Sequence, residues 1–175
     1  DPVQPEALLV GGVSNKHEST ILHSADNGSS WTPVLTLTPG YGFTTILFDP
    51  RHLGVVYAAE SHFHGLYKSM DGGLTWQEAN GNFSRSADAL RTYDLIGDGL
   101  GHLDRATAAG LYRSSDGGNE WTQTDTTALP GTAYALAAYQ VRTQHWLLAG
   151  SNRGGVYRTL IANMNNRVYL PLVYK

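Results

Sequence analysis

The stretch SMDGGLTW at residues 69–76 places a serine, an aspartate, two glycines and a tryptophan within eight positions. The same skeleton occurs as SADNGSSW at 24–31 and as SSDGGNEW at 114–121, so that the leading serines are 45 residues apart in each case. A constant period of this length indicates a chain built from repeated supersecondary units.

The repeat extends beyond this turn. GLYKS at 65–69 corresponds to GLYRS at 110–114, and GVYRT at 155–159 follows after one further period. In the second unit, four short runs have the composition of strands, and they lie at 44–50, 55–59, 65–69 and 75–79. Gly, Asp-Pro and Asn-Gly bound these runs, as expected for antiparallel strands joined by tight turns. Four such strands per unit predict an all-β fold, a β-propeller of about four blades.

The repeated turn lies between the third and fourth predicted strands, and each residue type in it has a structural task. The aspartate accepts hydrogen bonds from backbone N–H groups a few residues on, the glycine adopts a positive φ, and the tryptophan covers the turn with apolar surface. We therefore interpret the turns as structural fasteners. The residues concerned are Ser24, Asp26, Gly28 and Trp31; Ser69, Asp71, Gly73 and Trp76; and Ser114, Asp116, Gly118 and Trp121.

These three S-x-D-x-G-x-x-W stretches resemble the Asp-box, or BNR, motif. The chain is similar over residues 7–159 to the Asp-box β-propellers, which include sialidases, xyloglucanases, sortilin-type receptors and photosystem-assembly factors. The resemblance implies the propeller fold. It implies no particular activity, because in these families the motif lies at the blade periphery and away from the ligand site.

The predicted units cover about 7–35, 41–80, 88–125 and 132–166, and a tail follows at 167–175. The first unit lacks its innermost strand, and the last has LIANMNN in place of the repeated turn. We consider three arrangements: the tail closes a four-bladed ring, two chains complete one ring, or the tail is donated to a neighbouring subunit.

The tail itself permits three interpretations: an ordinary last strand, a donated strand, or a sorting or anchoring signal. In the second case, the assembly residues are Val168, Tyr169, Leu170, Leu172 and Val173.

The composition excludes several classes of protein. The net charge is −3 and no basic run is present, so nucleic acid is not expected as a partner. No cysteine is available for disulfides or thiolate metal sites, and no apolar run has the length of a membrane helix. Because the chain starts at Asp1, we interpret it as a mature extracellular or cell-surface protein whose signal peptide has been removed.

Catalytic patterns are weak in this sequence. A sialidase needs an arginine cluster, but no arginine precedes residue 24. Other glycosidases need two carboxylates across a cleft, for which the candidates are Asp49, Glu60, Asp88, Asp94 and Asp98. We predict that the chain is not an enzyme and needs no cofactor. We predict no metal either, although Glu60, His62 and His64 form a weak candidate set at alternate positions.

Loops that join the second and third strands share one propeller face with the loops between blades. The ligand candidates on this face are Tyr41, Phe43, His62, His64, Phe83, Arg85 and Arg153, with Phe63 and Asn152 beside them. Aromatic residues with polar neighbours suit sugars or peptides, while Phe43 and Phe83 are equally compatible with core packing. We predict a self-assembling interaction module, with a carbohydrate-binding propeller or a glycosidase fragment as alternatives.

Overall fold

The computed structural model describes residues 1–83, 85–124, 129, 131–163 and 172–173, and it describes no side chains beyond residue 160. Within these residues the chain forms four antiparallel sheets, and neighbouring strands in each sheet follow one another in sequence. The only described helix is the short α1 (Ala87–Leu90), between the second and third sheets. No helix among the described residues is long and apolar enough to cross a membrane.

The first sheet contains β1 (Leu8–Val13), β2 (Ser19–Ser24) and β3 (Thr32–Leu37). The second contains β4 (Phe43–Phe48), β5 (Val56–Glu60), β6 (Leu66–Ser69) and β7 (Gln77–Glu78). The third contains β8 (Thr92–Gly97), β9 (Leu103–Thr107), β10 (Gly110–Ser114) and β11 (Thr122–Gln123). The fourth contains β12 (Ala133–Val141), β13 (Gln144–Ser151), β14 (Val156–Asn163) and β15 (Leu172–Val173).

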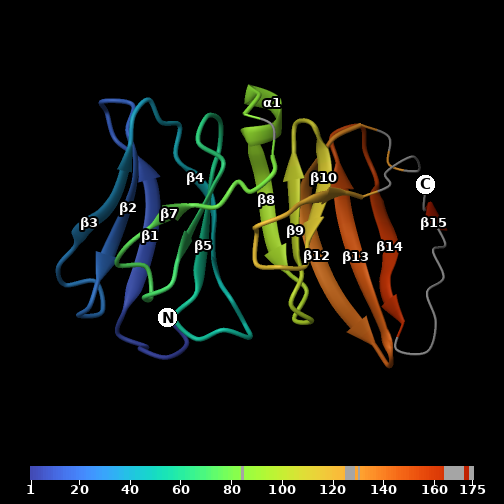
Figure 1. The fold of residues 1–175 in the computed structure, drawn as a ribbon, viewed down its shortest axis with the longest axis horizontal. Helices are drawn as coiled ribbons and strands as arrows, with labels where there is room; N and C mark the ends of the chain where they lie inside the picture. Colours follow the sequence, from blue (N-terminus) through green and yellow to red (C-terminus); the bar gives the residue numbers. More distant parts are fainter. Residues whose placement is uncertain (84, 125–128, 130, 164–171, 174–175) are drawn as a thin grey trace.

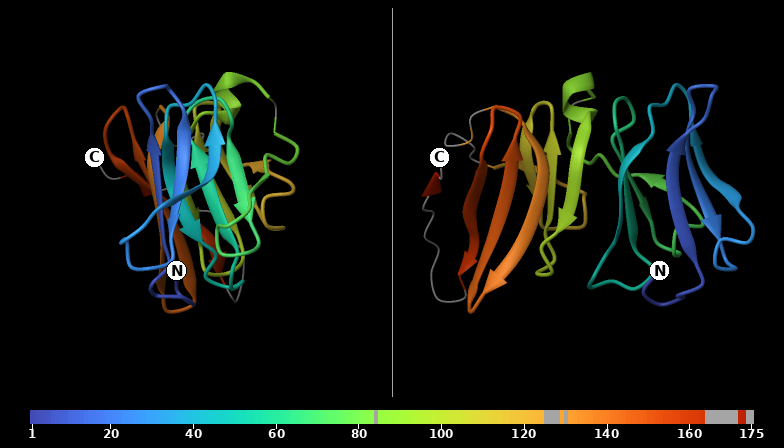
Figure 2. Two further views of the ribbon diagram at one scale, coloured as in Figure 1. Left: turned by 90° about the vertical axis from the view of Figure 1, so that its left-hand side faces the viewer. Right: turned by 180° about the vertical axis from the view of Figure 1, so that it is seen from behind.

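The sheets stand face to face in chain order, and the first and fourth lie at opposite ends of the row (Figure 1). The same open row is seen from behind in Figure 2. Consecutive first strands contact one another, β4 with β8 and β8 with β12. Closure of a four-bladed ring by the tail stays a prediction, as do the two arrangements that involve a second chain.

The hydrophobic core lies between the sheets rather than within any one of them. One cluster joins the second and third sheets through Tyr57, Leu66, Leu95 and Trp121. A second cluster joins the third and fourth sheets, and Leu111 is one of its members. Each sheet is too small to bury its own apolar face, so the sheets depend on stacking for stability.

The first sheet has three strands where the others have four, in agreement with the sequence. The repeated turn joins β2 to β3, just as it joins the third strand to the fourth in the next two sheets, so the strand that is absent is the innermost one. The free edge of β1 carries the exposed apolar side chains of Leu8, Val10 and Val13.

The two described residues of the tail pair with their own chain. Leu172 lies opposite Arg158 and Val173 lies opposite Tyr157, so that β15 is the fourth strand of the last sheet. The other residues predicted for an assembly tail, Val168, Tyr169 and Leu170, lie outside the described residues.

Candidate functional site

The three repeated turns share one hydrogen-bond pattern. In each turn the serine hydroxyl donates to the aspartate carboxylate, at 2.8 Å from Ser24, 2.7 Å from Ser69 and 2.8 Å from Ser114. Each tryptophan ring nitrogen donates to the carbonyl oxygen of the turn glycine three residues earlier. The side-chain polar groups of these serines, aspartates and tryptophans therefore bond within their own turns.

The exposure of the three tryptophans decreases along the chain. Trp31 is 38% exposed, Trp76 is half-buried and Trp121 is only 5% exposed. The turn of the third sheet lies against the second sheet, where Gly118 is close to Leu66. Trp31 belongs to the first sheet, which stands at one end of the row (Figure 1).

Three aromatic side chains gather at the end of the second sheet where β5 leads into β6. The rings of Tyr41 and His62 are stacked with their centroids 4.5 Å apart, and Phe63 meets Tyr41 edge to face at 5.4 Å. Tyr41 is 53% exposed and Phe63 is 41% exposed. We call Tyr41, His62 and Phe63 the aromatic cluster.

Glu60 holds the loop of the aromatic cluster in place. Its carboxylate is buried and accepts backbone N–H groups from Tyr41 at 3.0 Å, His62 at 2.8 Å and Phe63 at 2.7 Å, with His64 also donating. The hydroxyl of Ser19, from the first sheet, donates to the same carboxylate at 3.1 Å. Burial opposes ionisation, but these donors hold the pKa of Glu60 below its usual value.

This arrangement does not suit the weak metal set predicted from Glu60, His62 and His64. The Glu60 oxygens already accept backbone hydrogens, while His62 Nδ1 contacts Ser61 Oγ and His64 Nε2 contacts the carbonyl oxygen of Pro39. Within the described part of the chain, no group of three His, Asp or Glu side chains is arranged to hold a metal ion.

The remaining predicted ligand residues are dispersed. Phe83 packs into the core between the second and third sheets, against Tyr112 and Trp121. Phe43 is half-buried on β4. Arg85 is exposed and forms an ion pair with Glu78 at 2.8 Å, and Arg153 is exposed beyond the end of β13. These four residues do not join the aromatic cluster.

The candidate carboxylates are tied to their surroundings. Asp94 connects the first strands of three sheets, because it accepts the hydroxyl of Thr45 at 3.2 Å and the backbone N–H of Leu136 at 2.8 Å. Asp49 accepts the backbone N–H of Arg51 at 2.8 Å. The Asp98 side chain is buried and contacts His102 Nδ1 at 2.7 Å. Asp88, in α1, is exposed.

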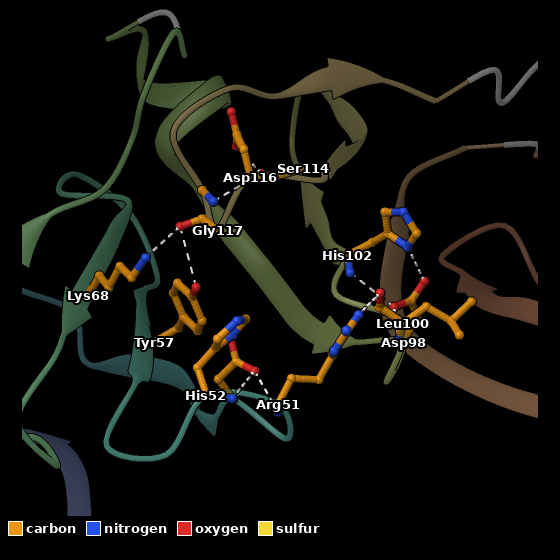
Figure 3. Close-up of polar contacts among 12 residues, drawn as sticks. Arg51, His52, Tyr57, Lys68, Asp98, Leu100, His102, Ser114, Asp116 and Gly117 are labelled. Atoms are coloured by element: carbon orange, nitrogen blue, oxygen red, sulfur yellow. Dashed lines mark hydrogen bonds and ion pairs between the residues drawn. The ribbon is translucent and has the colours of Figure 1, made fainter.

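A cavity of about 660 Å³ lies between the second and third sheets, at the opposite end of β5 from the aromatic cluster. The β4–β5 loop, the β8–β9 loop and the turn at 115–117 enclose it (Figure 3). Sequence reasoning missed this cavity, because its walls come from two different repeats. One sequence pattern is shared by two of its loops: a histidine follows an aspartate by three or four residues, His52 after Asp49 and His102 after Asp98.

The sequence and the fold were compared with those of known proteins. No protein-family model matches the sequence. The chain is 31% identical over 97 residues to a probable oligoxyloglucan-reducing end-specific xyloglucanase from Neosartorya fischeri, a match that covers 53% of this chain and 11% of that relative. The chain thus spans about a tenth of the length of the curated relative.

Solved structures match over nearly the whole chain. A GH74 enzyme from Niastella koreensis has a TM-score of 0.70 at 19% identity, covering 99% of this chain and 29% of that one. An ancestral GH74 enzyme has a TM-score of 0.65 at 14% identity, covering 93% and 25%. YCF48 bound to D1 peptide has a TM-score of 0.56 at 17% identity, covering 97% and 56%. This chain has a β-propeller fold.

The prediction that the chain is not an enzyme was wrong. The curated relative is named as a xyloglucanase, and two of the propellers with the same fold are named as GH74 enzymes.

Proposed function

We propose that this chain is a glycosidase-like β-propeller segment that binds a glucan chain such as xyloglucan through the aromatic cluster. The observation that carries the proposal is the aromatic cluster, in which the exposed ring of Tyr41 stacks on His62 and the exposed ring of Phe63 meets both edge to face. The similarity to a named xyloglucanase supplies the substrate class. From the same relationship we infer an extracellular location, where a polymeric glucan is accessible.

The geometry of the cluster supports a sugar ligand on physical grounds. A pyranose ring has an apolar face that packs on an aromatic ring, and its hydroxyl groups need hydrogen-bonding neighbours. Tyr41 and His62 supply both in one place. Because the backbone N–H groups of the loop are already bound by Glu60, little conformational entropy is lost when a ligand binds.

Titration with xyloglucan oligosaccharides, followed by calorimetry, tests the binding. We expect saturable binding, and we expect Tyr41→Ala and Phe63→Ala each to weaken it about tenfold, as loss of a stacking contact of about 1–1.5 kcal/mol would do. Leu74→Ala is the matched control, because Leu74 is 51% exposed on the repeated turn at the other end of its sheet. Equal affinity in all four proteins would overturn the proposal.

Hydrolysis is tested on the same protein by measuring new reducing ends released from xyloglucan. We expect release, with a KM about tenfold higher in Tyr41→Ala and a kcat that is nearly unchanged, because the cluster contacts the chain rather than the bond that breaks. Binding without any release would exclude glycosidase activity and leave a glycan-binding propeller.

Self-association is a second candidate function, and the free edge of β1 favours it. Leu8, Val10 and Val13 are 37%, 48% and 56% exposed along an edge that lacks the inner strand present in the other sheets. An exposed apolar edge strand pairs readily with a strand of another chain. Light scattering tests this: we expect oligomers that dissociate in Val10→Lys, and a monomer at all concentrations would exclude it.

A further inference from the structure

The cavity between the second and third sheets contains cationic groups with unused donors. Lys68 Nζ donates to the backbone carbonyl of Gly117 at 3.2 Å, and a guanidinium nitrogen of Arg51 donates to the carbonyl of Leu100 (Figure 3). Neither cation forms an ion pair with a carboxylate among the residues the structure describes. A guanidinium has five N–H donors and an ammonium has three, so both retain donors for a ligand.

The carboxylates around the cavity are already satisfied. Asp49 accepts hydrogen bonds from the 51–52 backbone and contacts His52. Asp98 binds His102 at 2.7 Å and lies 3.7 Å from Arg113. Asp116 accepts the backbone N–H of Glu120 at 2.9 Å, and this contact is the main reason that its pKa is lowered. These carboxylates are therefore hydrogen-bonded within the protein, whereas Arg51 and Lys68 keep donors for a ligand.

The rest of the cavity is largely apolar. Val55, Tyr57 and Leu103 form its inner wall and belong to the core between the two sheets. Leu53 and Met70, which also line it, are 75% and 68% exposed. Burial raises the pKa of Tyr57 to about 12, so its ring stays neutral beside Lys68, whose Nζ is 5.4 Å from the ring centroid. A ligand here meets an apolar wall, the cations Arg51 and Lys68, and the carboxylates of Asp49 and Asp116, which are already hydrogen-bonded to the protein.

We propose that this cavity binds a small molecule that combines a carboxylate with a ring bearing an apolar face. Arg51 pairs with the carboxylate, because a guanidinium matches the two oxygens of that group. Lys68 binds a second oxygen of the ligand, and the ring packs against Tyr57 and Leu103. A volume of about 660 Å³ is within the range of sites for molecules of this size.

Two sources of this chemistry exist, an acidic sugar and an aromatic acid, and glucuronate and benzoate represent them. The test is an NMR titration of the whole chain with each acid, with glucose as the neutral ring of the same shape. We expect at least one acid to bind tenfold or more tightly than glucose, and 0.5 M NaCl to weaken that binding. Preference for glucuronate identifies an acidic sugar, and preference for benzoate identifies an aromatic acid.

Variants assign the binding to this cavity. We expect Arg51→Gln and Lys68→Met each to weaken binding of the preferred acid about tenfold, and Lys68→Arg to restore it to within about threefold. Lys16→Met is the matched control, because Lys16 is an exposed lysine in the loop between β1 and β2. Glucose binding as well as both acids, or unchanged affinity in both cavity variants, would overturn the proposal. We expect Tyr41→Ala to leave acid binding unchanged, which would separate the cavity from the glucan site.

Discussion

Ser69 Oγ accepts the backbone N–H of Gly73 at 2.8 Å, and both residues are buried. The same relationship joins Ser114 to Gly118 at 2.9 Å and Ser24 to Gly28 at 2.8 Å. In each turn the serine also donates to the aspartate, so that one hydroxyl fixes both the acidic group and the glycine that reverses the chain. The repeated sequence is therefore a repeated hydrogen-bond network.

Replacing this hydroxyl leaves a buried donor without a partner. We expect Ser69→Ala to lower the free energy of unfolding by about 1–3 kcal/mol, because the N–H of Gly73 loses its acceptor. Ser115→Ala is the control, since Ser115 is the exposed second residue of the third turn, and we expect a change below about 0.5 kcal/mol. Urea denaturation of both variants measures the difference, and equal midpoints would contradict this assignment.

The turn aspartates make the fold sensitive to acid. Hydrogen bonds from the side chain and backbone of Ser30 lower the pKa of Asp26 to about 2. Burial opposes ionisation of Asp71, but its bonds from Thr75, Ser69 and Leu74 lower its pKa to about 2 as well. A carboxyl with a lower pKa in the folded than in the unfolded state stabilises the fold while it is ionised.

This stabilisation is complete above the unfolded pKa of about 4, and it is lost as the pH falls toward 2. We therefore expect the urea midpoint to be steady from pH 7 to 5 and to fall between about pH 4 and 2. Asp71→Asn removes one of the groups and makes that fall shallower. A midpoint that stays level or rises below pH 4 would be inconsistent with these contacts.

Glu60 connects stability to the glucan site. We expect Glu60→Ala to cost about 3 kcal/mol, because several backbone N–H groups lose a charged acceptor, and Glu60→Gln to cost less, because one acceptor oxygen remains. Both variants should also weaken glucan binding, since the loop of Phe63 is released. Glu120→Gln, on an exposed glutamate, should alter neither the urea midpoint nor the affinity. Unchanged stability in Glu60→Ala would refute this role.

Alanine substitutions at two glycines that lack a positive φ should affect stability differently. A Cβ at Gly40 would clash with the backbone nitrogen of Ser19, whereas a Cβ at Gly12 would meet no atom within 4 Å. We expect Gly40→Ala to destabilise the protein by about 3 kcal/mol through this overlap. Gly12→Ala should change stability by less than about 0.5 kcal/mol. Thermal unfolding compares them, and equal melting temperatures would be evidence against this close approach.

Much of the architecture was readable from the 45-residue period. The spacing predicted the β-propeller fold and placed the repeated turn between third and fourth strands, and the short first unit predicted a missing inner strand. These features depend on local patterns. Alternation of apolar residues and turn chemistry act over a few positions, so they are visible in the sequence itself.

The candidate sites were only partly readable. Tyr41 and His62 were both predicted on one face, but Phe83, from the same prediction, is packed against Trp121 in the core. The sequence could not separate these cases, because an aromatic residue in a loop has the same local pattern whether the next sheet covers it or not. In the same way, no local sequence pattern predicts that Glu60 accepts hydrogen bonds from four backbone N–H groups.

The sequence by itself determined the repeating unit, its strands and the turn that closes each unit, because these rest on neighbouring residues. Only the tertiary structure decided which side chains meet. Lys68 and Arg51 line one cavity with a turn of the next repeat, and Glu60 meets Ser19 of the preceding sheet. Such contacts depend on how one sheet stacks on another, and that stacking is set by the packing of whole apolar faces rather than by any short stretch of sequence.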